Sequence, residues 1–423
     1  MGILKFIVFS ILGQASLLVG CMAMLGLILQ KKSAVDVITG TLKTITGFLI
    51  FGIGASAAAG ALTSFQTLFS KGFHLTGVLP LAEAVTALAQ TKFPIVIALV
   101  MAFGFIANLI FARFTKFKYI FLTGQHSLFF AAMLTVLFKF MGISDLMTIV
   151  MGSVILGIAA CLYPAFCQRY MRDITGNDNI AMGHYCTLAY GISGWVGSKV
   201  GNKEQSTEKL NLPKWLSFLK DYVVSIALTM GIFYYVSAIA AGKANVDAVA
   251  GGVNWLLYPL MQSLTFAGGL YVVITGVRMF LAEIVPAFVG ISERLIPDAK
   301  PALDCPVVFP YAPTATVIGF ISAYCAGLIC MFIFAALKLP VIIPVATPYF
   351  FIGATAGVFG NATGGWKGCI AGAFITGVLI AVGPALMYPV FAHVGLVGSC
   401  FPETDFNFIG YIIYMIGKLL GIA

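Results

Sequence analysis

Continuous apolar runs, each long enough to cross a lipid bilayer, recur along the whole chain and restrict its fold more than any other feature. A bilayer core takes about 20 apolar residues per helix, and it admits only helices or closed barrels because backbone groups must be hydrogen-bonded within the protein. The runs are continuous rather than alternating, which favours helices over a barrel. Charged residues make up only 9% of the chain, against about 25% in a soluble domain. We therefore predict an all-α polytopic membrane protein.

Basic residues at the ends of the runs indicate the topology. Lys31 and Lys32 follow the first run, so its end is expected in the cytoplasm and the N-terminus outside. The same bias places the C-terminus in the cytoplasm after about eleven spans, and it explains the net charge of +9 without a nucleic-acid partner. The predicted spans are 6–30, 38–65, 94–112, 119–140, 144–167, 219–241, 252–285, 313–337, 339–360, 366–392 and 405–422.

Three segments lie among apolar sequence but are too short or too broken to cross the membrane. Residues 77–90, the glycine-rich residues 181–197 and the proline-containing residues 290–311 are predicted to be re-entrant. Irregular backbone at membrane depth is tolerated only where it is buried in protein or lines a cavity. These segments are therefore expected to surround a binding site. The polar residues 198–218 are expected to form a cytoplasmic loop.

Internal symmetry connects two of the broken segments. Residues 1–197 and 219–392 are predicted to form two five-span halves, and residues 393–423 a final span. Each half contains a long span followed by a broken segment with one carboxylate, Glu83 in the first half and Asp304 in the second. Corresponding spans run in opposite directions in the predicted topology. This pattern is typical of an inverted repeat with a substrate site at the bilayer midplane.

Three carboxylates are expected at or near membrane depth, namely Glu83, Glu283 and Asp304. A charge inside the membrane is unfavourable unless it faces a cavity or a partner, so a functional role is the first hypothesis for each. Glu283 lies near Arg278 and close to the cytoplasm, where a structural ion pair is an equally good interpretation. Glu83 and Asp304 have no close sequence partner, and we expect both to accept hydrogen bonds from a substrate.

Two of the four histidines lie beside glycines in segments expected to be unwound. His126 occurs in "LTGQHS" with Gln125 before it, and His184 occurs in "MGHYC". A single buried histidine is more often structural than a ligand contact, but the unwound context favours a polar site lining for both. His74 and His393 are expected in external loops.

Several other site classes are absent from the sequence. There is no HxxxH, HExxH or CxxC spacing, and the nine cysteines are scattered, so we predict neither a metal site nor a cofactor. The glycine-rich residues 360–368 lack the spacing of a phosphate loop. Energy for transport must then come from a partner or an ion gradient. On the residues alone, an ion-coupled secondary transporter with Glu83 or Asp304 as the proton carrier fits equally well.

Five stretches favour a partner as the energy source and leave the ion-coupled transporter as the alternative, because they resemble the ascorbate-type enzyme II C component of the sugar phosphotransferase system. They are "GTLKTITGF" (40–48), "LTGQHS" (122–127), "GVRMFLAEIVPAFVGISERLIPDAKPALDCP" (276–306), "YAPTA" (311–315) and "ATAGVFGNATGGWKG" (354–368). The resemblance runs nearly end to end. The long central match favours the ascorbate-type branch over the related galactitol-type branch.

The resemblance implies a homodimer of eleven-span chains in the bacterial plasma (inner) membrane. The long second and seventh spans would form a V-motif scaffold, and the remainder a mobile core that moves one carbohydrate or sugar acid inward like an elevator. The chain would not be an enzyme on its own. A separate cytoplasmic B component, itself supplied by an A component, would donate a phosphoryl group from a phosphocysteine.

The resemblance also implies a set of substrate-binding residues. Asp304 matches the family's buried aspartate, which contacts ligand hydroxyls and could also polarise one of them, and His184 matches the histidine of its "IGH" segment. Gly54 lies in the glycine-rich break of the second span. The expected set is Gly54, Ala55, Ala82, Glu83, Gln125, His126, Phe129, His184, Tyr185 and Asp304.

This chain departs from the family pattern at several of these positions. Gln125 and Phe129 stand where the ascorbate carriers have a histidine and a glutamine. Tyr185 replaces a glutamine, and Ala82 and Glu83 replace a threonine and a tyrosine. Exchanging hydrogen-bonding groups in a buried site changes discrimination strongly. The fold and mechanism are therefore expected to carry over, whereas the identity of the substrate is not.

Overall fold

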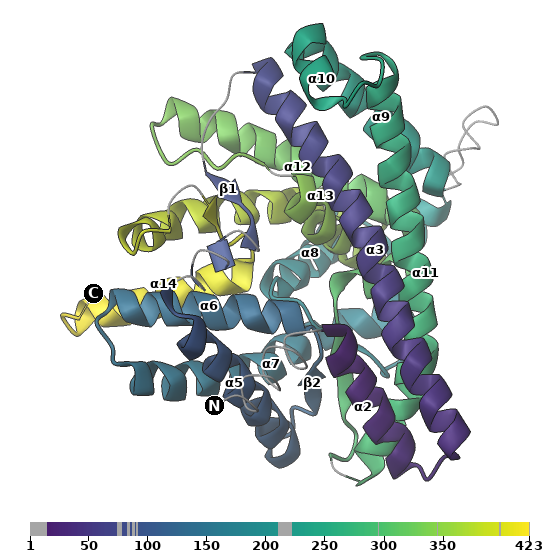
Figure 1. The fold of residues 1–423 in the computed structure, drawn as a ribbon, viewed down its shortest axis with the longest axis vertical. Helices are drawn as coiled ribbons and strands as arrows, with labels where there is room; N and C mark the ends of the chain where they lie inside the picture. The colour runs from purple at the N-terminus through teal and green to yellow at the C-terminus, as the bar shows by residue number, and fades with distance from the viewer. Residues whose placement is uncertain are drawn as a thin grey trace.

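The protein is mostly helical, with two long helices along one side and the other elements gathered beside them (Figure 1). The computed structural model describes residues 15–73, 78–82, 85–86, 89, 92–209, 222–294, 296–344, 346–396 and 399–422. The helices are α2 (Ala15–Leu29), α3 (Ala34–Phe73), α5 (Pro94–Phe114), α6 (Gly124–Phe140), α7 (Asp145–Thr175), α8 (Thr187–Val200), α9 (Tyr222–Ala241), α10 (Lys243–Val249), α11 (Leu257–Arg294), α12 (Pro313–Ala336), α13 (Ala346–His393) and α14 (Thr404–Leu419). Short 3-10 helices are η2 (Lys203–Gln205), η3 (Thr207–Lys209) and η5 (Cys305–Tyr311).

The apolar runs fold as helices of membrane-spanning length, as predicted for a polytopic membrane protein. Within the described residues, five helices are long and apolar enough to cross a bilayer. A sixth span results if Ile226–Ala241 and Lys243–Val249, which meet at a bend of 116°, are counted together. Eleven spans and the inverted repeat stay predictions.

The two long helices, α3 and α11, pack against each other along the long axis of the molecule, with α2 and α9 beside them (Figure 1). Lys43 on α3 and Glu283 on α11 form an ion pair across this interface, with 3.1 Å between Nζ and Oε1. Glu283 thus has the structural role considered from the sequence, although its partner is Lys43 rather than the nearby Arg278.

Helix α13 contains a break where the sequence predicted the boundary between two spans. Gly365 has φ 60° and ψ −151°, which is outside the helical region and is available mainly to glycine. A Cβ atom there would lie 2.3 Å from the carbonyl oxygen of Gln205 and 2.4 Å from that of Asn202. The break therefore lets the start of the predicted cytoplasmic loop pack directly on the backbone of α13.

The same loop is anchored to the N-terminus of α12. Oε1 of Glu208 accepts hydrogen bonds from the N–H groups of Thr314 (2.9 Å) and Ala315 (3.1 Å), and Oε2 accepts one from the Thr314 hydroxyl. The residue in the N-cap position, Ala312, makes no side-chain cap. Glu208 thus satisfies N–H groups that the first turn of a helix cannot pair internally.

The described residues include five short strands that were not part of the all-α prediction. They are β1 (Leu79–Pro80), β2 (Tyr119–Phe121), β3 (Ala181–Met182), β4 (Lys300–Leu303) and β5 (Ser399–Cys400). Strand β4 lies between β2 and β3 in one parallel sheet, and β1 pairs with β5 in parallel. Strands this short show no alternating pattern, so the sequence gives no signal for them.

Candidate functional site

The three-stranded sheet determines where the polar residues of the broken segments meet. In a parallel sheet the C-terminal ends of all strands lie on the same side of the sheet, which is called its edge here. Strand β2 is followed by the first turn of α6, β3 by the turn before α8, and β4 by η5. Residues that are far apart in the sequence are thereby placed side by side by backbone hydrogen bonds alone.

Asp304 lies at the centre of this edge, directly after the middle strand. Its Oδ1 accepts a hydrogen bond from the N–H of Cys305 (2.7 Å), so Asp304 caps the N-terminus of η5. Its Oδ2 accepts a hydrogen bond from Nε2 of Gln125 at 3.2 Å. Nε2 of His126 lies 3.5 Å from Oδ1. Asp304, Gln125 and His126, which the sequence offered as candidate site residues in two separate segments, thus form one polar group.

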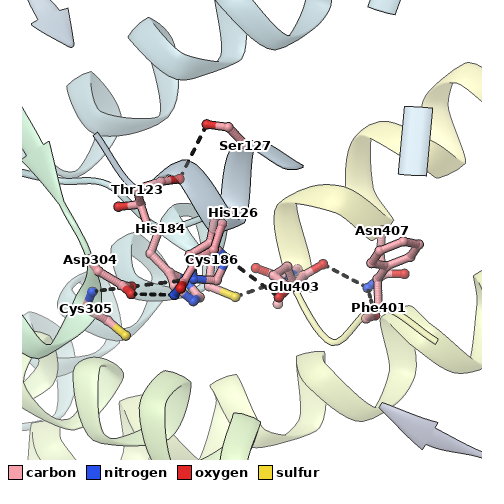
Figure 2. Close-up of polar contacts among 12 residues, drawn as sticks. Thr123, His126, Ser127, His184, Cys186, Asp304, Cys305, Phe401, Glu403 and Asn407 are labelled. Carbon is pink, nitrogen blue, oxygen red and sulfur yellow. Dashed lines mark hydrogen bonds and ion pairs between the residues drawn. The ribbon is translucent and has the colours of Figure 1, made fainter. Parts of the chain in front are cut away.

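His184 completes this group from the third strand. It is 3% exposed, and its ring centroid lies 4.2 Å from that of His126 at an interplanar angle of 68°. Its Nδ1 lies 3.0 Å from the hydroxyl oxygen of Tyr190, which orients the ring. One ligand atom each from His126, His184 and Asp304 lies within 4.8 Å of the others (Figure 2). No short-range sequence spacing predicts such a group.

Aromatic side chains form a wall beside the polar group. The ring of Phe129 meets that of His126 edge-on at 5.5 Å. Tyr185 is fully buried and lies between Phe121 and Phe130, with ring centroids 4.6 Å and 4.7 Å away. Its hydroxyl has no hydrogen-bond partner in the part of the chain that the structure describes. Phe129 therefore contacts the polar group directly, whereas Tyr185 packs in the apolar core next to it.

The remaining predicted residues come from the first part of the chain. Gly54 is buried on α3, the same helix that contains Ala55. Ala82 is 3% exposed and belongs to the same apolar cluster as Phe129. Glu83 lies outside the described residues. Participation of these four residues in the site stays a prediction.

Two acidic residues at the start of α14 were not among the predicted site residues. Oε1 of Glu403 lies 3.8 Å from Nδ1 of His126, on the side of the ring opposite Asp304 (Figure 2). Asp405 is fully buried. The sequence signal was present, because carboxylates just before an apolar helix are typical of a helix N-terminus. The same pattern is expected at the start of any span, so it does not by itself mark a functional site.

Asp405 organises the turn that contains His184. Its carboxylate accepts hydrogen bonds from the N–H of Thr187 (2.8 Å), the hydroxyl of Thr187 (2.7 Å) and the N–H of Leu188 (3.1 Å). The residue in the N-cap position of α8, Cys186, makes no side-chain cap. Asp405 thus caps α8 from another helix, and it fixes the position of the preceding turn.

The opposite edge of the sheet is held by an ion cluster. Asp178 pairs with Lys300 at the start of β4, accepts a hydrogen bond from Nε2 of Gln168 (2.7 Å) and lies 3.6 Å from the guanidinium of Arg172. Partial burial raises the pKa of Asp178, but these three groups outweigh it and lower the pKa below its usual value. The cluster attaches the middle strand to the end of α7.

Residues 10–405 match the family model described as the sugar-specific permease component of the PTS system. The chain is also similar to the ascorbate-specific PTS system EIIC component of Mycoplasma pneumoniae, with 27% identity over 416 residues. That similarity covers 85% of this chain and 63% of the relative, so the chain spans less than two thirds of the relative's length. The family match includes every segment that meets at the site.

Proposed function

This chain belongs to the family of sugar-specific permease components of the phosphotransferase system, and on that premise we propose that it carries an ascorbate-like sugar acid, or another carbohydrate, across the bacterial plasma membrane. A separate cytoplasmic B component, supplied by an A component, phosphorylates the cargo. The observation that carries this proposal is the group formed by Gln125, His126, His184 and Asp304 at the ends of three parallel strands.

The chemistry of this group suits a small molecule rich in hydroxyls. The carboxylate of Asp304 can accept hydrogen bonds from hydroxyl groups, and the Gln125 amide and the two imidazoles can donate them. Helix α6 begins at Gly124 beside the group, so the positive end of its dipole favours negative charge on the ligand. This feature supports a sugar acid over a neutral sugar. Gly54, Ala55, Ala82 and Glu83 belong to the proposed site on the family resemblance.

In this proposal Asp304 also assists phosphoryl transfer. It accepts a hydrogen bond from the attacking hydroxyl and takes its proton as the oxygen–phosphorus bond forms and the sulfur–phosphorus bond of the B component's phosphocysteine breaks. The basic residues of the cytoplasmic loop 198–218, together with Arg113, Lys116 and Lys118, attract the B component and its anionic phosphoryl group.

The proposed movement is of the elevator type. Helices α3 and α11, with 40 and 38 residues, form the long scaffold pair, and α6, α8 and η5 together carry the polar group. Because those three elements are joined through one sheet, they are suited to move as a unit. The family resemblance supports a homodimer built on the scaffold.

Uptake by membrane vesicles tests this function. Vesicles that contain the chain and enclose the purified, phosphorylated B component are expected to accumulate radiolabelled ascorbate, or another sugar acid from a panel, in phosphorylated form. In the matched control, the vesicles enclose a B component whose phosphorylatable cysteine is replaced by serine. These vesicles should accumulate no phosphorylated cargo. Accumulation of unmodified cargo without any B component would contradict the proposal. Sensitivity of that accumulation to an uncoupler would instead favour an ion-coupled transporter.

The substitution Gly183→Ala is expected to weaken ligand binding about tenfold or more. A Cβ atom on Gly183 would lie 2.3 Å from the carbonyl oxygen of Ala302, so β3 and β4 must separate. This moves His184 away from Asp304. The measurement is equilibrium binding of the radiolabelled ligand to purified protein. Gly268→Ala is the matched control, because a Cβ on this exposed glycine of α11 meets nothing within 4 Å. Equal binding by both variants would show that the strand spacing is not critical.

A further inference from the structure

His126 has a carboxylate beside each of its two ring nitrogens. Nε2 lies 3.5 Å from Oδ1 of Asp304, and Nδ1 lies 3.8 Å from Oε1 of Glu403 (Figure 2). A neutral imidazole carries one N–H group and one lone pair, so one of the two nitrogens would turn its lone pair toward a negatively charged oxygen. The imidazolium form directs an N–H group toward each carboxylate. The geometry therefore favours a positively charged ring.

Both separations belong to attraction between charges rather than to hydrogen bonding. They exceed the usual distance of about 2.9 Å between a nitrogen donor and an oxygen acceptor, but they lie within the distance of about 4 Å that defines an ion pair. The side chains of Asp304 and Glu403 are only 13% and 4% exposed, so solvent screens these attractions weakly. Two buried negative charges need a compensating positive charge. The His126 ring between them can provide it.

The side chain of Glu403 is directed to the site rather than to its own helix. Glu403 occupies the N-cap position of α14, but its side chain makes no cap hydrogen bond there. Its backbone carbonyl accepts a hydrogen bond from Nδ2 of Asn407 (2.9 Å), and the same amide donates to the carbonyl of Phe401 (2.9 Å) (Figure 2). Asn407 thus fixes the backbone at the start of α14, and the Glu403 carboxylate faces His126.

The hydrogen bonds of Asp304 indicate that it is ionised. Its Oδ1 accepts a hydrogen bond from the N–H of Cys305, and its Oδ2 accepts one from Nε2 of Gln125. A protonated carboxylic acid would use one of its oxygens as a donor instead. The His126 ring therefore faces a full negative charge on this side.

His184 is the third titratable group that faces His126, besides Asp304 and Glu403. The two ring centroids are only 4.2 Å apart, so a second positive charge on His184 would be repelled by the first. Nδ1 of His184 lies 3.0 Å from the hydroxyl oxygen of Tyr190, which is an uncharged partner. His126 is thus the ring of this pair that is suited to carry the charge.

We propose that Glu403 is a positioning residue that acts through His126: together with Asp304 it holds this ring as an imidazolium, which gives the site a positively charged hydrogen-bond donor. A hydrogen bond from a charged donor is roughly twice as strong as one between neutral groups. The charge of the ring does not depend on the proposed transport. That the charged N–H group favours an anionic cargo, such as a sugar acid, rests on the proposed function.

Nitrogen NMR of the purified chain, labelled at its histidine rings and without cargo, tests this inference. The chain has four histidines, and the His126 signals are those that disappear in His126→Gln. At about pH 7.5, where an ordinary imidazole is mostly neutral, wild-type His126 should show the chemical shifts of two protonated ring nitrogens. A wild-type ring that is neutral at this pH would overturn the proposal, whatever the variants do.

Substitutions assign the effect to Glu403. In Glu403→Gln the ratio of charged to neutral His126 should fall about tenfold or more, and it should rise again as the pH is lowered, because low pH favours the protonated ring. Glu403→Asp retains the carboxylate and should keep the ring charged. The matched control, Glu204→Gln, changes an exposed glutamate that pairs with Lys209 and should leave His126 as in the wild type. Thermal unfolding verifies that each variant is folded. An unchanged ratio in folded Glu403→Gln would also overturn the proposal.

Equilibrium binding of radiolabelled ascorbate separates this inference from the proposed function. Glu403→Gln should bind ascorbate about tenfold more weakly than the wild type at about pH 7.5, and the difference should shrink as the pH is lowered. If the ring is charged and both proteins bind equally, Glu403 has no part in cargo selection. If the ring is charged and no carbohydrate is bound or transported, the charge of His126 stands and the transport proposal fails. If transport occurs and the ring is neutral, the function stands and this inference fails.

Discussion

Asp304→Asn is expected to reduce carbohydrate uptake by about 10- to 100-fold. A hydrogen bond to a charged group contributes about 1.5–3 kcal/mol, and each 1.4 kcal/mol corresponds to about a tenfold change in affinity. Asparagine removes the charge that faces His126 and that we propose to bind ligand hydroxyls. It retains the ability to cap η5, because Asn and Asp are comparable N-cap residues. The measurement is initial uptake into vesicles, with thermal unfolding of the purified variant.

The control for this prediction is Asp298→Asn in the same segment. Asp298 is exposed and has φ 61°, a conformation that asparagine adopts with little strain. This variant should transport at the wild-type rate. If Asp304→Asn transports equally well and unfolds at the wild-type temperature, Asp304 is not a ligand contact.

Asp405→Ala is expected to lower the free energy of unfolding by about 3 kcal/mol or more, and to abolish ligand binding. The substitution leaves the buried N–H groups of Thr187 and Leu188 and the hydroxyl of Thr187 without their acceptor. An unsatisfied buried polar group costs about 1–3 kcal/mol. The turn with His184, directly before these residues, would lose its fixed position. Chemical denaturation in detergent measures the first effect, and equilibrium binding of the radiolabelled ligand measures the second.

Glu208→Ala provides a matched comparison, because Glu208 caps α12 with the same kind of hydrogen bonds. Its side chain is exposed, so water can replace it, and the loss should be about 1 kcal/mol, as for other helix caps. Ligand binding should be unchanged. A loss of stability as large as that of Asp405→Ala would mean that the burial of Asp405 does not explain its effect.

The sequence predicted the helices because continuous apolar runs have few other possible folds in a membrane. The predicted spans 94–112 and 313–337 agree with the bounds of α5 and α12 to within two residues, since charged residues or proline mark these ends. Asp304 and His184 were predicted as site residues because a polar residue in a broken apolar segment is unfavourable unless it has a function.

The arrangement of the site was beyond the reach of sequence reasoning. Gln125, His184 and Asp304 are brought together by strands of two to four residues, which leave no periodic pattern. Glu403 and Asp405 reach the site from the far end of the chain, and only the folded backbone relates them to His126 and Thr187. No local spacing encodes such long-range contacts.

The small sheet has a consequence for how this transporter can diverge. Its strands are joined through backbone hydrogen bonds, which depend little on side-chain identity. The residues just after the strands, including Gln125, His184 and Asp304, can therefore be exchanged during evolution while their positions in space are retained. Selection for a new nutrient can act on a few side chains at one edge and leave the rest of the fold intact.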